Sequence, residues 1–266
     1  MTGTEDQLTQ LASAFNEISH FIDNRWLDMM YTPVSSMRSR LIVTDGDYEG
    51  LTKTIVLQRG DGQVYDFQKL LGLNQYFVVG SAFLSGPSDI GWVAMVPAGA
   101  PYTEFSLIGL LHEIGHIRRW RKVVHLALTF SERLRVDPVH LYRYIKAIIM
   151  KRPKPFYEDS WPIESFERMH GLRSVEERAA AAWAYRHLRS LQKDGYGVIA
   201  DTRALSDIRM FVELALMTHE RIYIQGLMIR GLFRQAIDTM ECKPRYLSRP
   251  FKITFNRILK HFVAGS

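Results

Sequence analysis

Cysteine is nearly absent from this chain. Its 266 residues include one cysteine, Cys242, so no disulfide can form within the chain and a reducing compartment is the simpler setting. No apolar run approaches the ~18 residues that would span a bilayer. The first residues also lack the basic and apolar regions of a secretory signal peptide. We therefore expect a cytoplasmic protein without a transmembrane segment.

Phosphate-binding loops, repeats and low-complexity segments are missing as well. The glycines at 60–62 flank a single aspartate and are better interpreted as a turn than as a glycine-rich phosphate loop. Nothing in the pattern therefore indicates a nucleotide cofactor, and a metal is the only cofactor that we expect.

Acidic side chains are absent after Glu241. The tail beyond it holds six cations, which supply the whole net charge of +6, since residues 1–241 contain 28 basic and 28 acidic residues. A basic tail with interleaved aromatics suits nucleic acid, a membrane surface or an acidic partner. The alternative is a terminal segment that packs its aromatics on the domain and keeps its cations in water. The aromatic residues are Tyr246, Phe251, Phe255 and Phe262.

The most informative motif is the pentapeptide His112-Glu113-Ile114-Gly115-His116. On an α-helix, positions i and i+4 share one face, so His112 and His116 can reach one metal ion. Glu113 lies one step round the helix, where its carboxylate can act as general base toward a metal-activated water. The pattern H-E-x-x-H thus predicts a zinc site for hydrolysis. The alternative is a core helix whose two histidines are merely hydrogen-bonded.

Gly115 is unexpected inside this helix, because glycine costs about 1 kcal/mol relative to alanine in a helix interior. A close approach by a neighbouring backbone would explain it.

A third ligand is needed, since catalytic zinc usually takes three protein side chains. The metzincin pattern requires glycine at 119 and histidine at 122; Arg119 and Lys122 stand there, which excludes that class. His125 would need a separate turn to return to the metal. Glu177 is the favoured ligand, because Ala180, Ala181 and Ala184 would let its helix lie close to the motif helix.

Other interpretations of this segment remain open. Ser174 and Glu177 have the spacing of a capping box, in which Glu177 would bond a helix N-terminus instead of a metal. Glu176 is the competing ligand. The remaining candidates are Glu158, Asp159, Glu164, Glu167, His170 and His187.

Short β-like runs dominate the first hundred residues. Apolar residues at helical spacing predict an amphipathic helix over 5–30. Runs typical of strands follow, separated by turn signals, and a short helix is expected over 66–71. The expected strands are 40–44, 54–58, 76–82 and 92–97, and the turn signals are 45–47, 60–62 and 86–88.

Helices dominate from Thr103 onward, and Gly226 and Gly231 are weak points of the last one. Strands first and helices after predict an α+β fold in which one sheet packs on a helical layer. We divide one continuous domain into a β-rich part (1–100), the metal-site helices (101–195) and a helical segment with the basic tail (196–266). The expected helices are 103–122, 137–150, 174–193 and 206–238.

The motif helix, followed by Glu-Arg-Ala-Ala-Ala-Ala-Trp-Ala, resembles the gluzincin metallopeptidases, most of all the ImmA/IrrE-type cytoplasmic members. Their second helix runs Glu-x-x-Ala-(Asn/Asp)-x-(aromatic)-Ala, which places its glutamate at Glu177 and its aromatic residue at Trp183. Ala181 departs from this pattern, so a polar partner for a metal-binding histidine must come from elsewhere. The resemblance covers residues 92–185.

This resemblance implies a zincin-like core whose edge strand, expected at 90–97, lines the substrate cleft and holds an extended peptide. It also implies zinc-dependent hydrolysis of a protein or peptide substrate, with Zn²⁺ on His112, His116 and Glu177 and with water activated by Glu113. The donor to the developing oxyanion is left open among Tyr102, His170, Tyr185, His187, Tyr196 and His219.

Two rival functions follow from the same residues. One is a catalytically idle zincin scaffold that acts as a partner-binding or nucleic-acid-associated regulatory protein, with its cleft or its basic tail as the contact. The other is a metallohydrolase that acts on something other than peptides.

Overall fold

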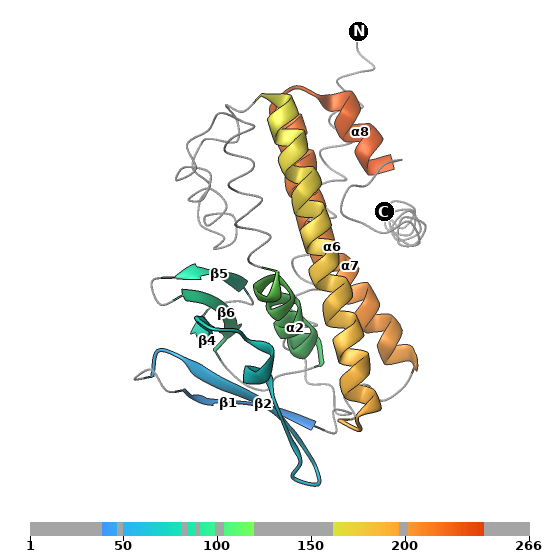
Figure 1. Ribbon diagram of the computed structural model, residues 1–266. Coiled ribbons are helices and arrows are strands. Elements are labelled where there is room, and N and C mark those ends of the chain that lie inside the picture. Colours follow the sequence, from blue (N-terminus) through green and yellow to red (C-terminus); the bar gives the residue numbers. More distant parts are fainter. Residues whose placement is uncertain are drawn as a thin grey trace.

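The strands of the N-terminal part form one mixed sheet. The computed structural model describes residues 39–46, 50–80, 84–88, 91–98, 104–119, 162–196 and 202–241. The strands run in the order β1-β2-β4-β6-β5, and β3 pairs with β2 outside this path (Figure 1). Their bounds are β1 Ser39–Asp45, β2 Lys53–Arg59, β3 Val64–Asp66, β4 Gln75–Gly80, β5 Leu84–Ser88 and β6 Gly91–Pro97.

Some predicted segments lie outside the described residues. They are the helices expected at 5–30 and 137–150, the connection between the motif helix and residue 162, and the basic tail after Glu241.

Alternating apolar side chains cover one face of the first hairpin. β1 and β2 pair antiparallel, with Leu41 opposite Leu57 and Val43 opposite Ile55. Leu41, Ile55 and Leu57 are buried, because successive residues of a strand point to opposite faces and these three point to the helical side. The predicted turn at 60–62 joins β2 to β3, and Gly62 takes a φ of 86° there, which favours glycine.

β6 lies inside the sheet, so the expectation of an edge strand at 90–97 was wrong. It pairs in parallel with β4 and antiparallel with β5. Its apolar residues Trp92 to Val96 are largely buried, as is typical of a strand covered on both faces. β5 forms the edge instead and contains residues 86–88, which were predicted as a turn. Pro87 is tolerated there because an edge strand does not need every N–H for its ladder.

Helices follow the strands along the chain, which confirms the α+β prediction. A one-turn helix, η1 (Phe67–Leu70), lies within the sheet region, and Asp66 accepts from the Gln68 N–H at its start. The longer helices are α2 (Glu104–Arg118), α6 (Ile163–Lys193), α7 (Thr202–Ile229) and α8 (Phe233–Glu241). None of the helices in the described ranges is long and apolar enough to span a bilayer.

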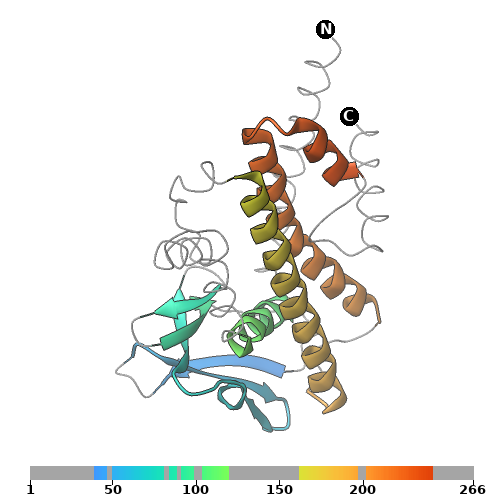
Figure 2. The ribbon, with the colours of Figure 1, turned by 45° about the horizontal axis from the view of Figure 1, so that its top comes forward.

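α2 lies between the sheet and the pair α6 and α7 (Figures 1 and 2). This central position explains its broad apolar surface, since strands contact one side of the helix and helices contact the other. A single core joins these layers, so α2 is held on both sides and its histidines have a fixed support. The α2 residues that are fully buried are Leu107, Ile108, Leu110, Leu111, Ile114 and Ile117.

Helix boundaries differ from the prediction most clearly in two places, and α7 also begins at Thr202, four residues before the expected start at Ser206. α6 begins at Ile163, eleven residues before the expected start at Ser174, with Pro162 as its N-cap. The helix expected over 206–238 is two helices, because Gly231 takes a φ of 71° between α7 and α8. Gly226 does not break α7; a Cβ there would lie 2.5 Å from Phe166 Cζ, so the glycine makes room for the ring.

Gly115 marks the contact between α2 and α6, which confirms the predicted close approach. A Cβ at Gly115 would lie 3.1 Å from both the Cα and the carbonyl oxygen of Ala180. Ala180, Ala181 and Ala184 are buried, so small side chains line this contact on the α6 side as well. The two helices can therefore come close enough for short side chains to meet across them.

We expect Gly115→Val to lower the free energy of unfolding by about 1–3 kcal/mol, because the backbone of Ala180 cannot move without separating α2 from α6. Urea unfolding of the metal-free protein measures this change. Ala182→Val places a valine at an exposed position of α6 and serves as the control. A Gly115→Val protein as stable as the control would contradict the close contact.

Candidate metal centre

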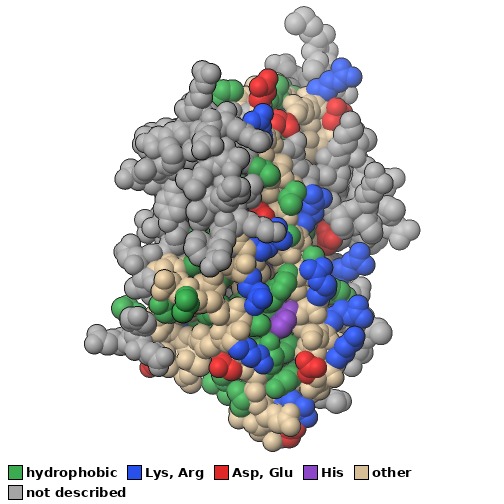
Figure 3. Space-filling model, in the orientation of Figure 1, with side chains coloured by type: hydrophobic (Ala, Val, Ile, Leu, Met, Phe, Trp, Pro, Cys, Tyr) green, Lys and Arg blue, Asp and Glu red, His purple; other side chains and the backbone are tan. Residues whose placement is uncertain are grey.

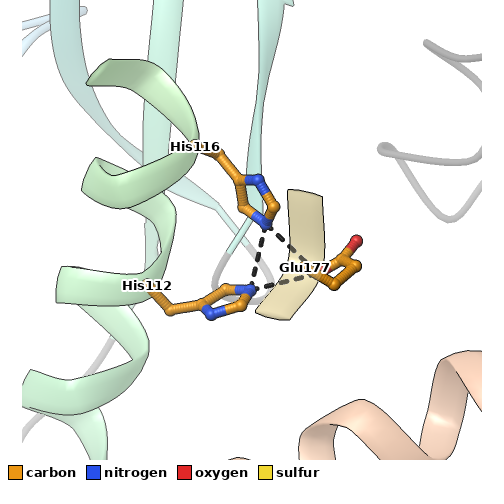
Figure 4. A group of neighbouring side chains, drawn as sticks. All are labelled: His112, His116 and Glu177. Atoms are coloured by element: carbon orange, nitrogen blue, oxygen red, sulfur yellow. Dashed lines mark hydrogen bonds and ion pairs between the residues drawn. The ribbon is translucent and has the colours of Figure 1, made fainter. Parts of the chain in front are cut away.

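His112 and His116 lie one turn apart on α2 and point toward α6 (Figure 4). Their Nε2 atoms are 3.0 Å apart, and their rings meet edge to face at a centroid distance of 4.6 Å. The sequence spacing alone predicts a shared face, and the buried apolar residues around them decide that this face is turned inward.

Glu177 completes the group from α6. Its Oε2 lies 3.2 Å from Nε2 of His112 and 3.2 Å from Nε2 of His116. We call these three residues the triad. Their side chains are mostly buried, with exposed fractions of 19%, 15% and 11% for His112, His116 and Glu177.

Ser174 shows why the capping-box interpretation was wrong. It lies inside α6, so there is no helix N-terminus for Glu177 to bond. The Ser174 hydroxyl donates to the carbonyl of Gly171, at 2.8 Å, as serine does within helices. The carboxylate of Glu177 is therefore available to the two histidines.

The triad could hold one metal ion. Its three donor atoms lie within 4.8 Å of one another. Three tetrahedral donors at about 2.0–2.1 Å from a common zinc ion lie about 3.3 Å apart, close to the 3.0–3.2 Å found here. Two imidazoles and one carboxylate are a donor set that zinc accepts, and other divalent transition metals accept it too.

The negative charge of Glu177 and the positive charge of a protonated histidine beside it stabilise each other. Burial alone would raise the pKa of Glu177, but the facing histidines, His219 first and His116 next, hold it well below its ordinary value. Burial would lower the pKa of His116, but the Glu177 carboxylate outweighs it and raises that pKa. Glu177 is therefore an anion at neutral pH, which is the form that binds a cation.

Glu113 follows His112 on α2 and is partly buried. Its charge also contributes to the raised pKa of His116, so the carboxylate is close enough to act on the triad electrostatically. This placement is compatible with the predicted general base.

Glu176, the competing ligand, is engaged elsewhere. It forms a bidentate ion pair with Arg119, with both N···O distances at 2.8 Å. The hydrogen bond to Glu176 raises the pKa of Arg119 despite the cost of burial. This pair ties the end of α2 to α6, three residues after His116 and one residue before Glu177.

We expect Glu176→Gln to lower the free energy of unfolding by about 1–2 kcal/mol, because it removes the charge that the fork of Arg119 binds. A double-mutant cycle with Arg119→Gln, followed by urea unfolding, measures the coupling. Arg168→Gln, which makes the same change at an exposed position of α6, is the control. Additive effects of Arg119→Gln and Glu176→Gln would show that the pair does not stabilise the contact.

None of the remaining candidate ligands that the structure describes joins the triad. Glu158, Asp159 and His125 lie outside the described residues, and Glu164 is exposed. Glu167 accepts hydrogen bonds from Tyr223 and Gln235, and the ring of His170 is buried against Phe166 and Tyr223.

Two further side chains contact Glu177. His219, on α7, places Nε2 3.3 Å from Oε2, the oxygen that faces the triad histidines. Arg173 places Nε 3.7 Å from Oε1, the other oxygen. His219 was one of several residues predicted to donate to the developing oxyanion, whereas the sequence analysis missed Arg173. Its i,i+4 spacing to Glu177 is a sequence signal that could have found it once α6 is known to start at Ile163.

The other residues predicted to donate to the oxyanion lie apart from Glu177 or outside the described residues. Tyr102 is outside them. His187 lies 2.9 Å from the Tyr65 hydroxyl through Nε2 and stacks on Trp183. Tyr196 packs edge to face on Tyr65, and Tyr185 packs against the core. His219 is thus the one predicted donor for which a contact with the triad is found among the described residues.

The environment of His187 should make the stability of the protein depend on pH. Burial first, then Arg118 and Lys69, lower its pKa below 6.5. In the unfolded chain this imidazole takes up a proton near pH 6.5. In the folded protein it stays neutral until the pH is lower. The free energy of unfolding therefore falls as the pH decreases through this interval. Thermal unfolding should show a smaller fall for His187→Gln than for the wild type. Equal falls would mean that this imidazole is not held neutral by the fold.

Comparison with known proteins adds no family to these observations: no protein-family model, curated protein or solved structure matches the chain.

Proposed function

We propose that this protein is a zinc-dependent metallopeptidase that hydrolyses peptide bonds in a protein or peptide substrate. The observation that carries the proposal is the meeting of His112, His116 and Glu177 across two helices, with Glu113 beside the first histidine. The gluzincin resemblance assigns these same four residues the roles of three ligands and one base. The triad supports the ligand roles, and the peptide substrate rests on the resemblance.

Each residue of the site has a distinct role in this proposal. His112, His116 and Glu177 would hold the ion. Bound zinc would supply Lewis-acid chemistry, which activates water and polarises a carbonyl group. Glu113 takes a proton from the attacking water and delivers it to the leaving amine. The low pKa of Glu177 keeps its carboxylate charged, so the charge of a dication is partly balanced inside the protein.

His219 is the proposed donor to the developing oxyanion. Its pKa is lowered by burial, and Arg173 and His112 lower it further while Glu177 acts in the opposite direction, so the imidazole is neutral at neutral pH. A neutral imidazole can still donate one N–H, and Nε2 is the nitrogen that faces the triad. Arg173 holds the second oxygen of Glu177 and so orients the carboxylate.

A peptide library tests the proposal. The zinc-loaded protein is incubated with peptides derived from a whole proteome, and new termini are identified by mass spectrometry, with and without a zinc chelator. His112→Ala is the matched control. We expect cleavages that disappear with the chelator and with His112→Ala. Bound zinc in the absence of any cleavage would overturn the peptidase assignment and favour the idle scaffold.

A further inference from the structure

The second half of α6 carries an exposed row of cations that the metal centre does not use. Arg178, Arg186, Arg189 and Lys193 are all exposed, and no acidic residue occurs between Glu177 and Asp194. We call these four residues the basic stripe. Figure 3 shows Lys and Arg side chains gathered over the face along which α6 runs.

Helix geometry places the four cations on one side. With 100° per residue, they fall within about 80° of the helix circumference, and they span about 22 Å along the axis. Ala182 lies in the middle of the row and is also exposed, so no large side chain separates the cations. The basic stripe is therefore a straight, narrow line of positive charge.

The stripe does not serve the fold through ion pairs. Other cations of the protein do: Arg119 pairs with Glu176, and Arg59 pairs with Asp61. Arg178 donates from Nε to the Ser174 carbonyl, one turn earlier. Arg186, Arg189 and Lys193 form no ion pair with any part of the chain that the structure describes. Their charges face solvent and repel each other, a cost that an anionic partner would remove.

Further cations extend this surface toward the sheet. Arg118, at the end of α2, is exposed and lies over the Trp183 ring at 5.7 Å. Lys69 is also exposed and lies over the Tyr65 ring at 3.4 Å. Trp183 and His187, one turn apart on the same helix, stack on each other at a centroid distance of 4.9 Å.

We propose that the basic stripe binds the phosphate backbone of a nucleic acid. Three of its four residues are arginines, whose planar guanidinium groups match phosphate oxygens in pairs. A protein partner would instead need an apolar centre, and along α6 the nearest exposed large apolar residue is Val175, one turn before the first arginine of the stripe. Backbone contacts of this kind do not depend on base sequence. The proposal does not depend on metal binding or on peptide hydrolysis.

Charge-reversal variants of the full-length protein test it. Binding of a fluorescent 20-base-pair DNA duplex is followed by anisotropy over a range of salt concentrations. The stripe variant is Arg186→Glu, Arg189→Glu and Lys193→Glu. The control variant reverses three exposed arginines on other elements, Arg40→Glu, Arg209→Glu and Arg234→Glu, and has the same net charge.

The stripe variant should bind at least about tenfold more weakly at low salt than the control, and its slope of log K against log salt should be smaller by about 2.7, since each lost phosphate contact removes about 0.9. Equal loss in both variants would show an effect of net charge alone and overturn the proposal. So would the absence of any duplex binding by the wild type.

Two arms separate the other possible contacts. In a full-length variant, the six tail cations after Glu241 are replaced by glutamine. If this change abolishes binding and the stripe variant binds normally, the tail is the contact and the proposal fails.

Polyglutamate, at the same total concentration of negative charge as the duplex, serves as an anionic competitor without phosphate. Displacement of the duplex by equal concentrations of polyglutamate would indicate an acidic protein partner instead, whereas selective retention of DNA supports the phosphate assignment.

Discussion

Replacing Glu113 by glutamine is expected to lower peptide turnover by about a hundredfold to ten-thousandfold while the zinc content stays unchanged. The amide keeps the size and shape of the side chain but cannot take a proton from water. His112 and His116 keep their positions, because the helix around them is anchored by fully buried residues on both sides of the motif. Elemental analysis and turnover of a cleaved peptide, both at neutral pH, measure the two quantities.

The control for this variant is Glu164→Gln, which makes the same chemical change at an exposed position of α6 far along the helix from Glu177. It should leave both turnover and zinc unchanged. An active Glu113→Gln protein would remove Glu113 from the mechanism. Loss of zinc in Glu113→Gln would instead assign this carboxylate a role in holding the metal.

Glu177→Ala is expected to weaken zinc binding by more than about a hundredfold, since it removes one of three ligands, and the loss of a mere supporting partner already costs about ten- to a hundredfold. Competition with a chromophoric chelator measures the affinity. The variant also leaves His219 and Arg173 without the carboxylate that they contact, so the metal-free protein should be less stable as well.

Glu176→Ala is the matched control for the affinity measurement. It removes an adjacent glutamate from the same helix, together with its ion pair to Arg119. Both variants lose an ion pair between elements, but only Glu177→Ala loses an atom that faces His112 and His116. Equal zinc affinities in the two variants would show that Glu177 is not a ligand, and a greater loss in Glu176→Ala would reverse the assignment of the two residues.

Local patterns were sufficient to predict a large part of the site. The i,i+4 spacing of His112 and His116 sets their geometry on any helix, whatever surrounds it. Gly115 indicated a close helix contact, and Ala180 supplies it. The alanines after Glu177 indicated which later helix makes this contact. These predictions succeeded because each depends on backbone geometry and side-chain size within one or two turns.

Other features required distant partners and could not be read from one segment. Ser174 and Glu177 have the spacing of a capping box, and only the earlier start of α6 shows that no helix begins there. The run at 92–96 is apolar whether a strand lies at an edge or inside a sheet, and the pairing of β5 beyond it decides the question. Glu177 was favoured over Glu176 from the sequence, but only the ion pair with Arg119 shows that Glu176 is engaged elsewhere.

The sequence by itself determined the helix that presents two histidines on one face, the glutamate beside them and the small residues that allow a second helix to approach. These are consequences of helical periodicity and side-chain volume. Only the tertiary structure decided between Glu177 and its competitors as the third residue, placed His219 and Arg173 against it, and left the four cations of the basic stripe facing solvent. Packing selects the contacts between elements that are far apart in the chain. Each helix forms its own backbone hydrogen bonds equally well in many orientations, so only burial against its neighbours distinguishes one orientation from another.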